Sequence, residues 1–558
     1  MNRLAPADIA AVPVPQAANL SLLLSQAAAL FPDRPGLIQG DRRWTWAQID
    51  ARVNALVQGL RALGMQAGDR LLVQSRNGIA LFESCWAAFR LGAVWVPVNF
   101  RLTPSEVAWL GHASGATAML AEEDFAGHVD TVRAASPRLR HVITIGRPRE
   151  SQGEQDYEQL LHDNAGAPAS TAHVHADTPL WFFYTSGTTG RPKAAMLTHG
   201  QMAFVVTNHL ADLIPGTDER DCSIAVAPLS HGAGIHALLN VARGAATVLP
   251  TADRLDPAEV WELVQRHRVT NLFTVPTIVK LLVEDPAVDR FDHGSLRYVV
   301  YAGAPMYHAD QQRALHKLGP VLVQYFGLGE VTGCITVLTP SMHALDDGHS
   351  DGSTSTAETL IGTCGRPRTG MEVAILDHRL QPVPTGAIGE ICCRGPAVFA
   401  GYHDNPEATA QAFRGGWFHT GDLGRLDERG LLYITGRESD MYISGGSNVY
   451  PREVEEALLT HPAVAEVAVL GMPDATWGEI GVAVVVARGG ADATAGDLTA
   501  EALLAHLEGR CARYRWPRQF HFWDALPRSG YGKVVKKEIR ERLLQNMTQG
   551  KEQAAPTP

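Results

Sequence analysis

The chain contains few cysteines, and their spacing argues against the sites that cysteine usually builds. Seven occur in 558 residues, an odd number, and none stands in the C-x-x-C spacing of a zinc site. They are Cys85, Cys222, Cys334, Cys364, Cys392, Cys393 and Cys511. We therefore expect reduced thiols in a cytoplasmic protein.

Long apolar runs and an excess of basic residues are also missing. The amino terminus, MNRLAPADIAAVPVPQAANLSLLL, has one arginine and several prolines among its apolar residues, so it predicts neither a signal peptide nor a membrane span. The formal net charge is -11, and Lys and Arg are scattered along the chain. Nucleic acid is therefore not expected as a partner, and the expected location is the cytoplasm.

The chain does have enough apolar sequence for several cores. Its 558 residues are 45% hydrophobic, which favours roughly three or four domains or subdomains. From residue 20 to about 340, helical stretches such as 46–63 alternate with short apolar runs such as 70–74, 93–98 and 180–185. This alternation predicts α/β layers with largely parallel sheets.

The composition changes after residue 340. Residues 341–359 are polar and small, which predicts an exposed loop. The short runs VAIL, GEICCRG and LLYITG then predict a small β-rich subdomain. A second α/β unit begins near Asp440, with helices expected at 451 and at 498–508 and strands at 464–470 and 482–487.

The predicted fold class is therefore α/β, in two unequal domains. A large N-terminal domain of α/β layers covers residues 1–437 and includes the β-rich subdomain at about 365–437. A small α+β C-terminal domain covers residues 438–545. Residues 546–558 are expected to form a disordered tail.

The strongest motif, YTSGTTGRPK at residues 184–193, follows the apolar run LWFFYT. Glycine lets backbone N–H groups approach an anion, hydroxyls add donors, and lysine adds a charge, so the motif predicts a polyphosphate site. Its spacing, GxxGxxK, is not that of a Walker loop. The candidate phosphate-binding residues are Thr185, Ser186, Gly187, Thr188, Thr189, Gly190 and Lys193.

This motif resembles the signature of the superfamily of acyl-CoA synthetases, peptide-synthetase adenylation domains and luciferases. The resemblance runs from about residue 20 to about 540. It implies an ATP-dependent carboxylic acid:CoA ligase, which forms acyl-AMP and pyrophosphate and then acyl-CoA and AMP. The implied cofactor is Mg²⁺, and ATP and CoA are the co-substrates.

The resemblance also assigns the nucleotide site. The segment YAGAPM supplies the adenine loop, QYFGLGE supplies the stacking ring of Phe326 and the Mg²⁺ ligand Glu330, and WFHTGD supplies the ribose ligand Asp422. Gly329 stands where the family usually has a threonine that touches the α-phosphate. The remaining implied nucleotide contacts are Gly303, Ala304, Pro305, Tyr325, Gly327 and Arg437.

In the C-terminal part the resemblance implies a domain that rotates between two half-reactions. Its hinge falls at Ser439, where the family usually has Asp or Lys. Ser444, Gly445 and Gly446 are implied to line the channel for the pantetheine of CoA. Lys533 is implied to be the essential cation of adenylation, in a loop where Tyr531 replaces a small residue. Thr185, Glu330 and His231 complete the expected catalytic set.

The implied acyl pocket carries no Lys or Arg in segments 204–209, 231–239, 303–305 and 327–336. A buried second carboxylate would lack a cation there, so malonate-like diacids and amino acids are disfavoured. We expect an uncharged medium-chain or aromatic acid, with His231 at the pocket mouth. Three readings stay open: transfer to CoA, transfer to a carrier protein, and a nucleotide-binding pseudoenzyme. The expected partners are the carboxylic acid, ATP and CoA, and a homodimer is one possible assembly.

Overall fold

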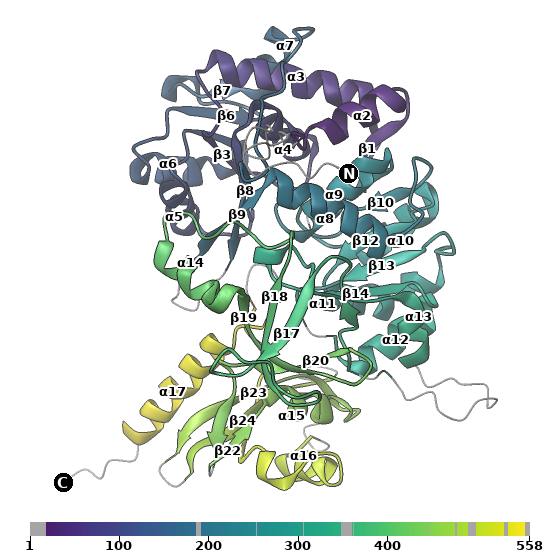
Figure 1. The fold of residues 1–558 in the computed structure, drawn as a ribbon, viewed down its shortest axis with the longest axis vertical. Helices are drawn as coiled ribbons and strands as arrows, with labels where there is room; N and C mark the ends of the chain where they lie inside the picture. The colour runs from purple at the N-terminus through teal and green to yellow at the C-terminus, as the bar shows by residue number, and fades with distance from the viewer. Residues whose placement is uncertain are drawn as a thin grey trace, which may run out of the picture.

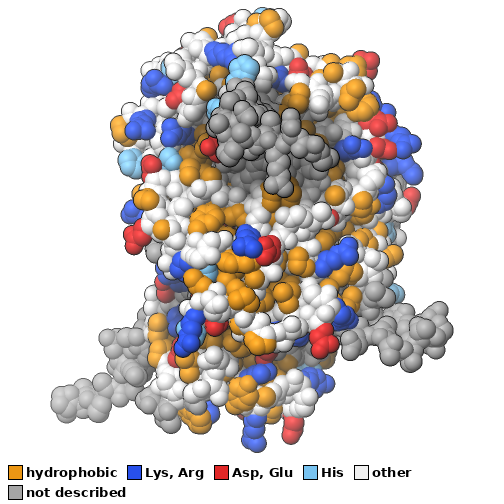
Figure 2. Space-filling view, in the orientation of Figure 1, with side chains coloured by type: hydrophobic (Ala, Val, Ile, Leu, Met, Phe, Trp, Pro, Cys, Tyr) orange, Lys and Arg blue, Asp and Glu red, His pale blue; other side chains and the backbone are white. Residues whose placement is uncertain are grey.

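The computed structural model describes residues 18–185, 191–252, 254–304, 306–346, 360, 362–444, 446–474, 477–488, 498–528 and 534–552. Three sheets form the part up to Arg437, and a fourth sheet forms the smaller part that follows, which lies below the larger part in Figure 1. Lys and Arg are interspersed with Asp and Glu over the face shown in Figure 2.

The first sheet has seven strands in the order β7-β6-β5-β3-β4-β8-β9, parallel except for the last pair. Strand β4 is buried along its whole length, as its sequence VWVPV requires of a strand covered on both faces. The strands are β3 (Arg70–Gln74), β4 (Val94–Val98), β5 (Ala118–Glu122), β6 (His141–Ile145), β7 (Gln155–Asp156), β8 (Pro179–Thr185) and β9 (Lys193–Thr198).

The second sheet has nine strands in the order β16-β15-β14-β13-β12-β10-β11-β1-β2. Its six central strands are parallel, and antiparallel strands close both edges. The strands are β1 (Pro35–Gln39), β2 (Arg42–Thr45), β10 (Cys222–Ile224), β11 (Ala246–Leu249), β12 (Asn271–Thr274), β13 (Tyr298–Tyr301), β14 (Leu322–Phe326), β15 (Thr336–Leu338) and β16 (Arg366–Pro367).

Helices cover these two sheets, and several begin at side-chain caps. Thr45, Thr103 and Thr198 each form a capping box with the residue three positions on. The helices are α2 (Leu22–Leu30), α3 (Trp46–Ala62), α4 (Ile79–Leu91), α5 (Pro104–Ser114), α6 (Ala126–Ala135), α7 (Tyr157–Asp163), α8 (His199–Asp212), α9 (Gly232–Arg243), α10 (Pro257–His267), α11 (Pro276–Glu284), α12 (His308–Leu318) and α13 (Pro340–Asp346).

The third and fourth sheets complete the chain. Antiparallel strands β17 (Glu372–Leu376), β18 (Gly389–Arg394), β19 (Phe418–Leu426) and β20 (Leu432–Arg437) form one, and helix α14 (Pro406–Ala412) lies beside it. The C-terminal sheet contains β21 (Tyr442–Ser444), β22 (Ser447–Val449), β23 (Val464–Asp474), β24 (Gly478–Ala487) and β25 (Gln519–Phe522). Its helices are α15 (Pro451–Leu459), α16 (Ala500–Leu507) and α17 (Lys536–Glu552).

The α/β class with largely parallel sheets is confirmed, and two local predictions are corrected. The first part of the predicted exposed loop at 341–359 lies in helix α13, where His343 is buried and its Nε2 lies 2.8 Å from the hydroxyl of Tyr301, whereas residues 347–359 lie outside the described residues. Helix α17 continues to Glu552, beyond residue 545 where a disordered tail was expected. All seven cysteines are free, and no helix within the described ranges is long and apolar enough to cross a membrane.

Candidate active site

The sequence motifs converge where parallel strands of both large sheets end. Thr185 is the last residue of β8, and Phe326 is the last residue of β14. Gly303 follows β13 with a φ of +84°, a backbone conformation that glycine adopts without strain. The carboxyl edge of a parallel sheet is the usual ligand site of such folds. Residues 186–190 and Pro305, both assigned to the nucleotide, lie outside the described residues.

Glu330 is the carboxylate at the centre of this edge. Its side chain is buried, and its Oε1 accepts hydrogen bonds of 2.9 Å from the hydroxyls of both Thr185 and Tyr402. The backbone N–H of Phe399 also donates to its carbonyl oxygen, at 2.8 Å. Within the described part of the chain no Lys, Arg or His forms an ion pair with this carboxylate. A buried carboxylate without a cation is costly, so the site fits a bound cation such as Mg²⁺.

Tyr402 was not anticipated from the sequence, because its partner Glu330 is 72 residues away along the chain. Residues 400–403 run beside β9, with Met196 N donating to Gly401 O at 3.0 Å. This pairing places the Tyr402 ring 5.3 Å below the Nζ of Lys193. Burial and the neighbouring charge of Glu330 raise the pKa of Tyr402. The phenol therefore stays protonated and donates to the carboxylate.

His231 and Gly329 both lie against the ring of Phe183. His231 precedes helix α9, and its ring centroid lies 4.2 Å from that of Phe183. A Cβ on Gly329 would lie 2.6 Å from Phe183 Cδ1 and 2.9 Å from Thr185 Cγ2. The space that a threonine side chain would need at position 329 is therefore filled by Phe183. The close approach of Phe183 and Thr185 therefore favours glycine at position 329.

Gly329→Thr is accordingly expected to lower the rate of acid-dependent pyrophosphate release by about tenfold, because overpacking costs about 1–3 kcal/mol. Adding Phe183→Ala to this variant should restore part of the lost rate by vacating the space. Both variants are to be compared with Phe183→Ala alone in the same assay. A Gly329→Thr enzyme that is faster than the parent would contradict this account of the packing.

The proposed ribose ligands are brought together as expected. Asp422 in β19 pairs with Arg437 in β20, and Arg437 Nε donates to Asp422 Oδ1 at 3.1 Å. The backbone N–H of Asp422 donates to Thr420 Oγ1 at 3.0 Å, and Thr420 in turn donates to the carbonyl of Ile391 at 2.7 Å. Asp422 is buried, whereas Arg437 is half exposed. The carboxylate is thus held in place before any sugar binds.

A second side-chain cluster lies directly behind this pair. The side-chain ligand atoms of Glu390, Cys392 and His419 lie within 4.8 Å of one another, as metal ligands do. Arg414 Nη2 already lies 3.1 Å from His419 Nδ1 and 3.4 Å from Glu390 Oε2. A guanidinium so close would repel a metal cation. Because Glu390 Oε1 also accepts from Gly421 N at 3.1 Å, the cluster serves to fix the segment that carries Asp422.

One buried cation beside the acyl segments was also missed by the sequence. Arg368 is almost fully buried, and its Nη2 lies 3.3 Å from Nδ1 of His209 in α8. Its Nε forms a 3.0 Å ion pair with Asp212. Its charge is therefore balanced inside the protein. Burial and the neighbouring positive charge of Arg368 hold the pKa of His209 well below its usual range.

The C-terminal motif residues are only partly described. Ser439 is exposed and its hydroxyl donates to Asp440 at 3.4 Å, while Gly446 has a φ of +82° in the turn between β21 and β22. Ser444 pairs with Gly478 across two strands. Lys533 and Gly445 lie outside the described residues, so their assignments stay predictions.

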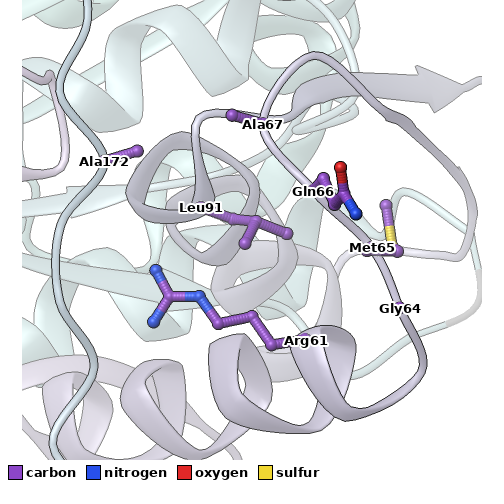
Figure 3. Close-up of a pocket in the computed structure, with 7 residues that line it drawn as sticks. All are labelled: Arg61, Gly64, Met65, Gln66, Ala67, Leu91 and Ala172. Atoms are coloured by element: carbon purple, nitrogen blue, oxygen red, sulfur yellow. The ribbon is translucent and has the colours of Figure 1, made fainter.

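A surface hollow elsewhere takes no part in this constellation. It has a volume of about 390 Å³ and lies at the ends of α3 and α4 (Figure 3). Its lining residues precede β3 and β4, so it opens at the opposite edge of the sheet from Thr185. They are Arg61, Gly64, Met65, Gln66, Ala67, Leu91 and Ala172.

Comparison with known proteins agrees with this geometry. Residues 24–403 match the family of AMP-binding enzymes, and residues 453–533 match the AMP-binding enzyme C-terminal domain. Feruloyl-CoA synthase of an Amycolatopsis species is 36% identical over 92% of this chain and 97% of its own. Indoleacetate–CoA ligase of Aromatoleum aromaticum is 31% identical over 94% and 98%.

A solved structure extends the likeness to the whole fold. The anthranilate CoA ligase AuaEII, in complex with anthranoyl-AMP, superposes with a TM-score of 0.83 and is 25% identical over 95% of this chain and 98% of its own. The family match covers more than half of the chain and includes the edge where Thr185 contacts Glu330. The chain therefore belongs to the AMP-binding enzyme family and is an AMP-forming acid–thiol ligase of the adenylate-forming superfamily.

Proposed function

We propose that the enzyme joins an uncharged aromatic acid to coenzyme A at the expense of ATP. The observation that carries this choice of acid is a row of rings beside the candidate site. Tyr325 stacks on Phe273 at 5.7 Å and 12°, and the rings of His209 and His236 flank this pair at 5.8 and 6.2 Å. Three of these rings are buried, and together the four form an aromatic wall that suits contact with a flat acyl group. Feruloyl-CoA synthase, indoleacetate–CoA ligase and anthranilate CoA ligase support the same class.

In the first half-reaction the substrate carboxylate attacks the α-phosphorus of ATP, and pyrophosphate leaves. The carboxylate needs no deprotonation, so the main task is to offset charge repulsion and align the attack. A bound Mg²⁺ would supply positive charge to the phosphates. Glu330 would hold that ion, with Thr185 and Tyr402 fixing the carboxylate, and Asp422 with Arg437 would orient the ribose. We assign Lys533 to the same charge neutralisation.

In the second half-reaction the thiol of CoA attacks the acyl carbon, and AMP leaves. Support for CoA comes from the surface beside Ser444. Trp477, next to the Gly478 that pairs with Ser444, is 41% exposed and carries the guanidinium of Arg518 4.0 Å above its ring. An exposed indole can stack on a base, and a guanidinium can pair with a phosphate. Ser444, Gly445 and Gly446 would then guide the pantetheine.

Trp477→Ala is expected to raise the KM for CoA at least about fivefold, because base–aromatic stacking contributes roughly 1–3 kcal/mol. Acid-dependent pyrophosphate release without CoA should keep its rate. Phe522→Ala removes another exposed aromatic ring, at the end of β25, and serves as the matched control. An unchanged KM for CoA, together with transfer to the phosphopantetheine of a carrier protein, would favour the carrier as the acceptor.

The acid itself is tested by comparing kcat/KM for benzoate, cinnamate, octanoate, acetate, malonate and alanine. We expect the two aromatic acids to lead and octanoate to follow. Each CH₂ buried against the apolar wall contributes about 0.8 kcal/mol, which disfavours acetate. A preference for malonate or alanine would refute this reading of the pocket. Arg368, the buried cation beside it, is paired with Asp212 and is not free for a second carboxylate, and Glu330, the carboxylate that an ammonium group would need, is assigned to the metal.

A further inference from the structure

A small cavity lies beneath helix α9. Its volume is about 10 Å³, which is room for roughly one water molecule. Helix α9 forms the roof through Ala233, His236 and Ala237, three positions that share one face of the helix. The other lining residues are Ser223, Ile224, Ala225, Leu229, Thr247 and Phe273.

Of the polar side chains in this lining, Thr247 and His236 decide what the cavity can bind. Thr247 is 2% exposed, and its hydroxyl has no hydrogen-bond partner among the described residues. His236 is also buried, and its Nε2 lies 2.7 Å from Asn271 Oδ1. A buried hydroxyl that forms no hydrogen bond is costly. The cavity therefore lacks an oxygen or nitrogen atom that would complete it.

The hydrogen bonds around His236 determine which of its ring nitrogens is a donor and which is an acceptor. Asn271 Nδ2 donates to Asn240 Oδ1 at 3.1 Å, so Asn271 Oδ1 is the acceptor that faces His236. His236 Nε2 must then carry a proton. Burial lowers the pKa of His236 to about 4, so the ring is neutral and its Nδ1 is an acceptor. The cavity thus offers an acceptor at His236 and a donor at Thr247, which is the complement of a hydroxyl group.

The cavity is also placed at the far end of the candidate acyl site. His231 directly precedes α9, and His236 comes five residues later, roughly 7.5 Å along a helix at 1.5 Å per residue. Phe273 lines the cavity on one side and stacks on Tyr325, beside the proposed adenine ring contact Phe326, on the other. A ring that lies between His231 and the cavity would direct its distal substituent into the cavity.

We propose that this cavity receives the hydroxyl group of a phenolic acid, whose O–H donates to His236 Nδ1 and whose oxygen accepts from Thr247 Oγ1. This proposal rests on the aromatic acid:CoA ligase function above and narrows its substrate class. The hydroxyl fills the water-sized space, while the ring itself lies against Phe273 and the alanines of α9. An acid without the hydroxyl leaves the buried hydroxyl of Thr247 unpaired, and a site with such an unpaired group discriminates against that acid.

The test compares kcat/KM for 4-hydroxybenzoate with benzoate, and for 4-hydroxycinnamate with cinnamate. The wild type should prefer one hydroxylated acid over its parent at least about tenfold. Thr247→Val keeps the shape and removes the donor, so the preference should fall about tenfold while kcat/KM for the unsubstituted acid holds. Ser136→Ala, which also removes a buried unpartnered hydroxyl but at the end of helix α6, outside this cavity, should leave the preference intact.

Two results would overturn the proposal. One is equal use of hydroxylated and unsubstituted acids by the wild type, a comparison that needs no variant to fold. The other is a Thr247→Val enzyme that loses activity on all acids alike, as expected if the cavity holds only a structural water. Ser223→Ala gives a second variant with a milder change in the same lining. Failure of every acid to release pyrophosphate would instead count against the ligase function itself.

Discussion

Glu330→Gln is expected to lower the rate of acyl-adenylate formation on the order of 100-fold or more. Glutamine keeps an oxygen that can accept from Thr185 and Tyr402, so the local packing should survive. The variant loses the negative charge that would hold the metal ion, and charge stabilisation of this kind is worth roughly 2.7–4 kcal/mol. Acid-dependent ATP–pyrophosphate exchange at saturating ATP measures the loss.

A direct metal readout separates this role from a general defect. The concentration of Mg²⁺ that gives half-maximal exchange should be higher for Glu330→Gln than for the wild type. Mn²⁺ should also bind less tightly to the complex of this variant with ATP than to that of the wild type. Glu428→Gln alters an exposed carboxylate on a surface turn and serves as the matched control. Unchanged metal dependence with full activity would show that Glu330 is not the metal ligand.

Lys533→Ala is expected to remove acyl-adenylate formation almost entirely while sparing the transfer of a preformed acyl-adenylate to CoA. A single positive charge at the α-phosphate is needed only while pyrophosphate leaves, so the loss should again be on the order of 100-fold or more and confined to one half-reaction. The two halves are measured separately, by pyrophosphate exchange and by thioester formation from synthetic benzoyl-AMP.

The neighbouring Lys537 supplies the comparison for this variant. It is exposed on α17, and among the described residues its ion pair is a long, 4.0 Å contact with Glu541, so Lys537→Ala should change neither half-reaction. Lys536 is a poorer control because it is paired with Glu455 at 2.7 Å. Equal loss of both half-reactions in Lys533→Ala would contradict its assignment to adenylation alone.

Much of the fold could be predicted from the sequence, because the strands depend on the apolar pattern of a few consecutive residues. The short apolar runs at 70–74, 93–98 and 180–185 carry their own signals, and the structure places β3, β4 and β8 there. The start of α13 carried only the Thr339–Pro340 pair, which favours a helix start. Its polar composition suggested exposure, and only the distant hydroxyl of Tyr301 explains why His343 is buried.

The residues of the candidate site also fall into those that short sequence motifs predicted and those that they did not. Glycines and hydroxyls near Thr185 and the carboxylate of Glu330 could be recognised within short motifs, and the structure brings those two residues into contact. Tyr402 and Arg368 could not be predicted, because each acts through a partner more than 70 residues away in the chain. Gly329 was read as a missing hydroxyl, whereas its neighbour Phe183 accounts for it sterically.

The central claim is that one enzyme couples an aromatic acid to CoA through an acyl-adenylate. Mass-spectrometric analysis of all products from cinnamate or 4-hydroxycinnamate, ATP, Mg²⁺ and CoA tests it most directly. We expect equal amounts of the acyl-CoA, AMP and pyrophosphate, with acyl-AMP accumulating when CoA is withheld. Formation of ADP and phosphate, or ATP consumption that does not depend on an acid, would contradict the account.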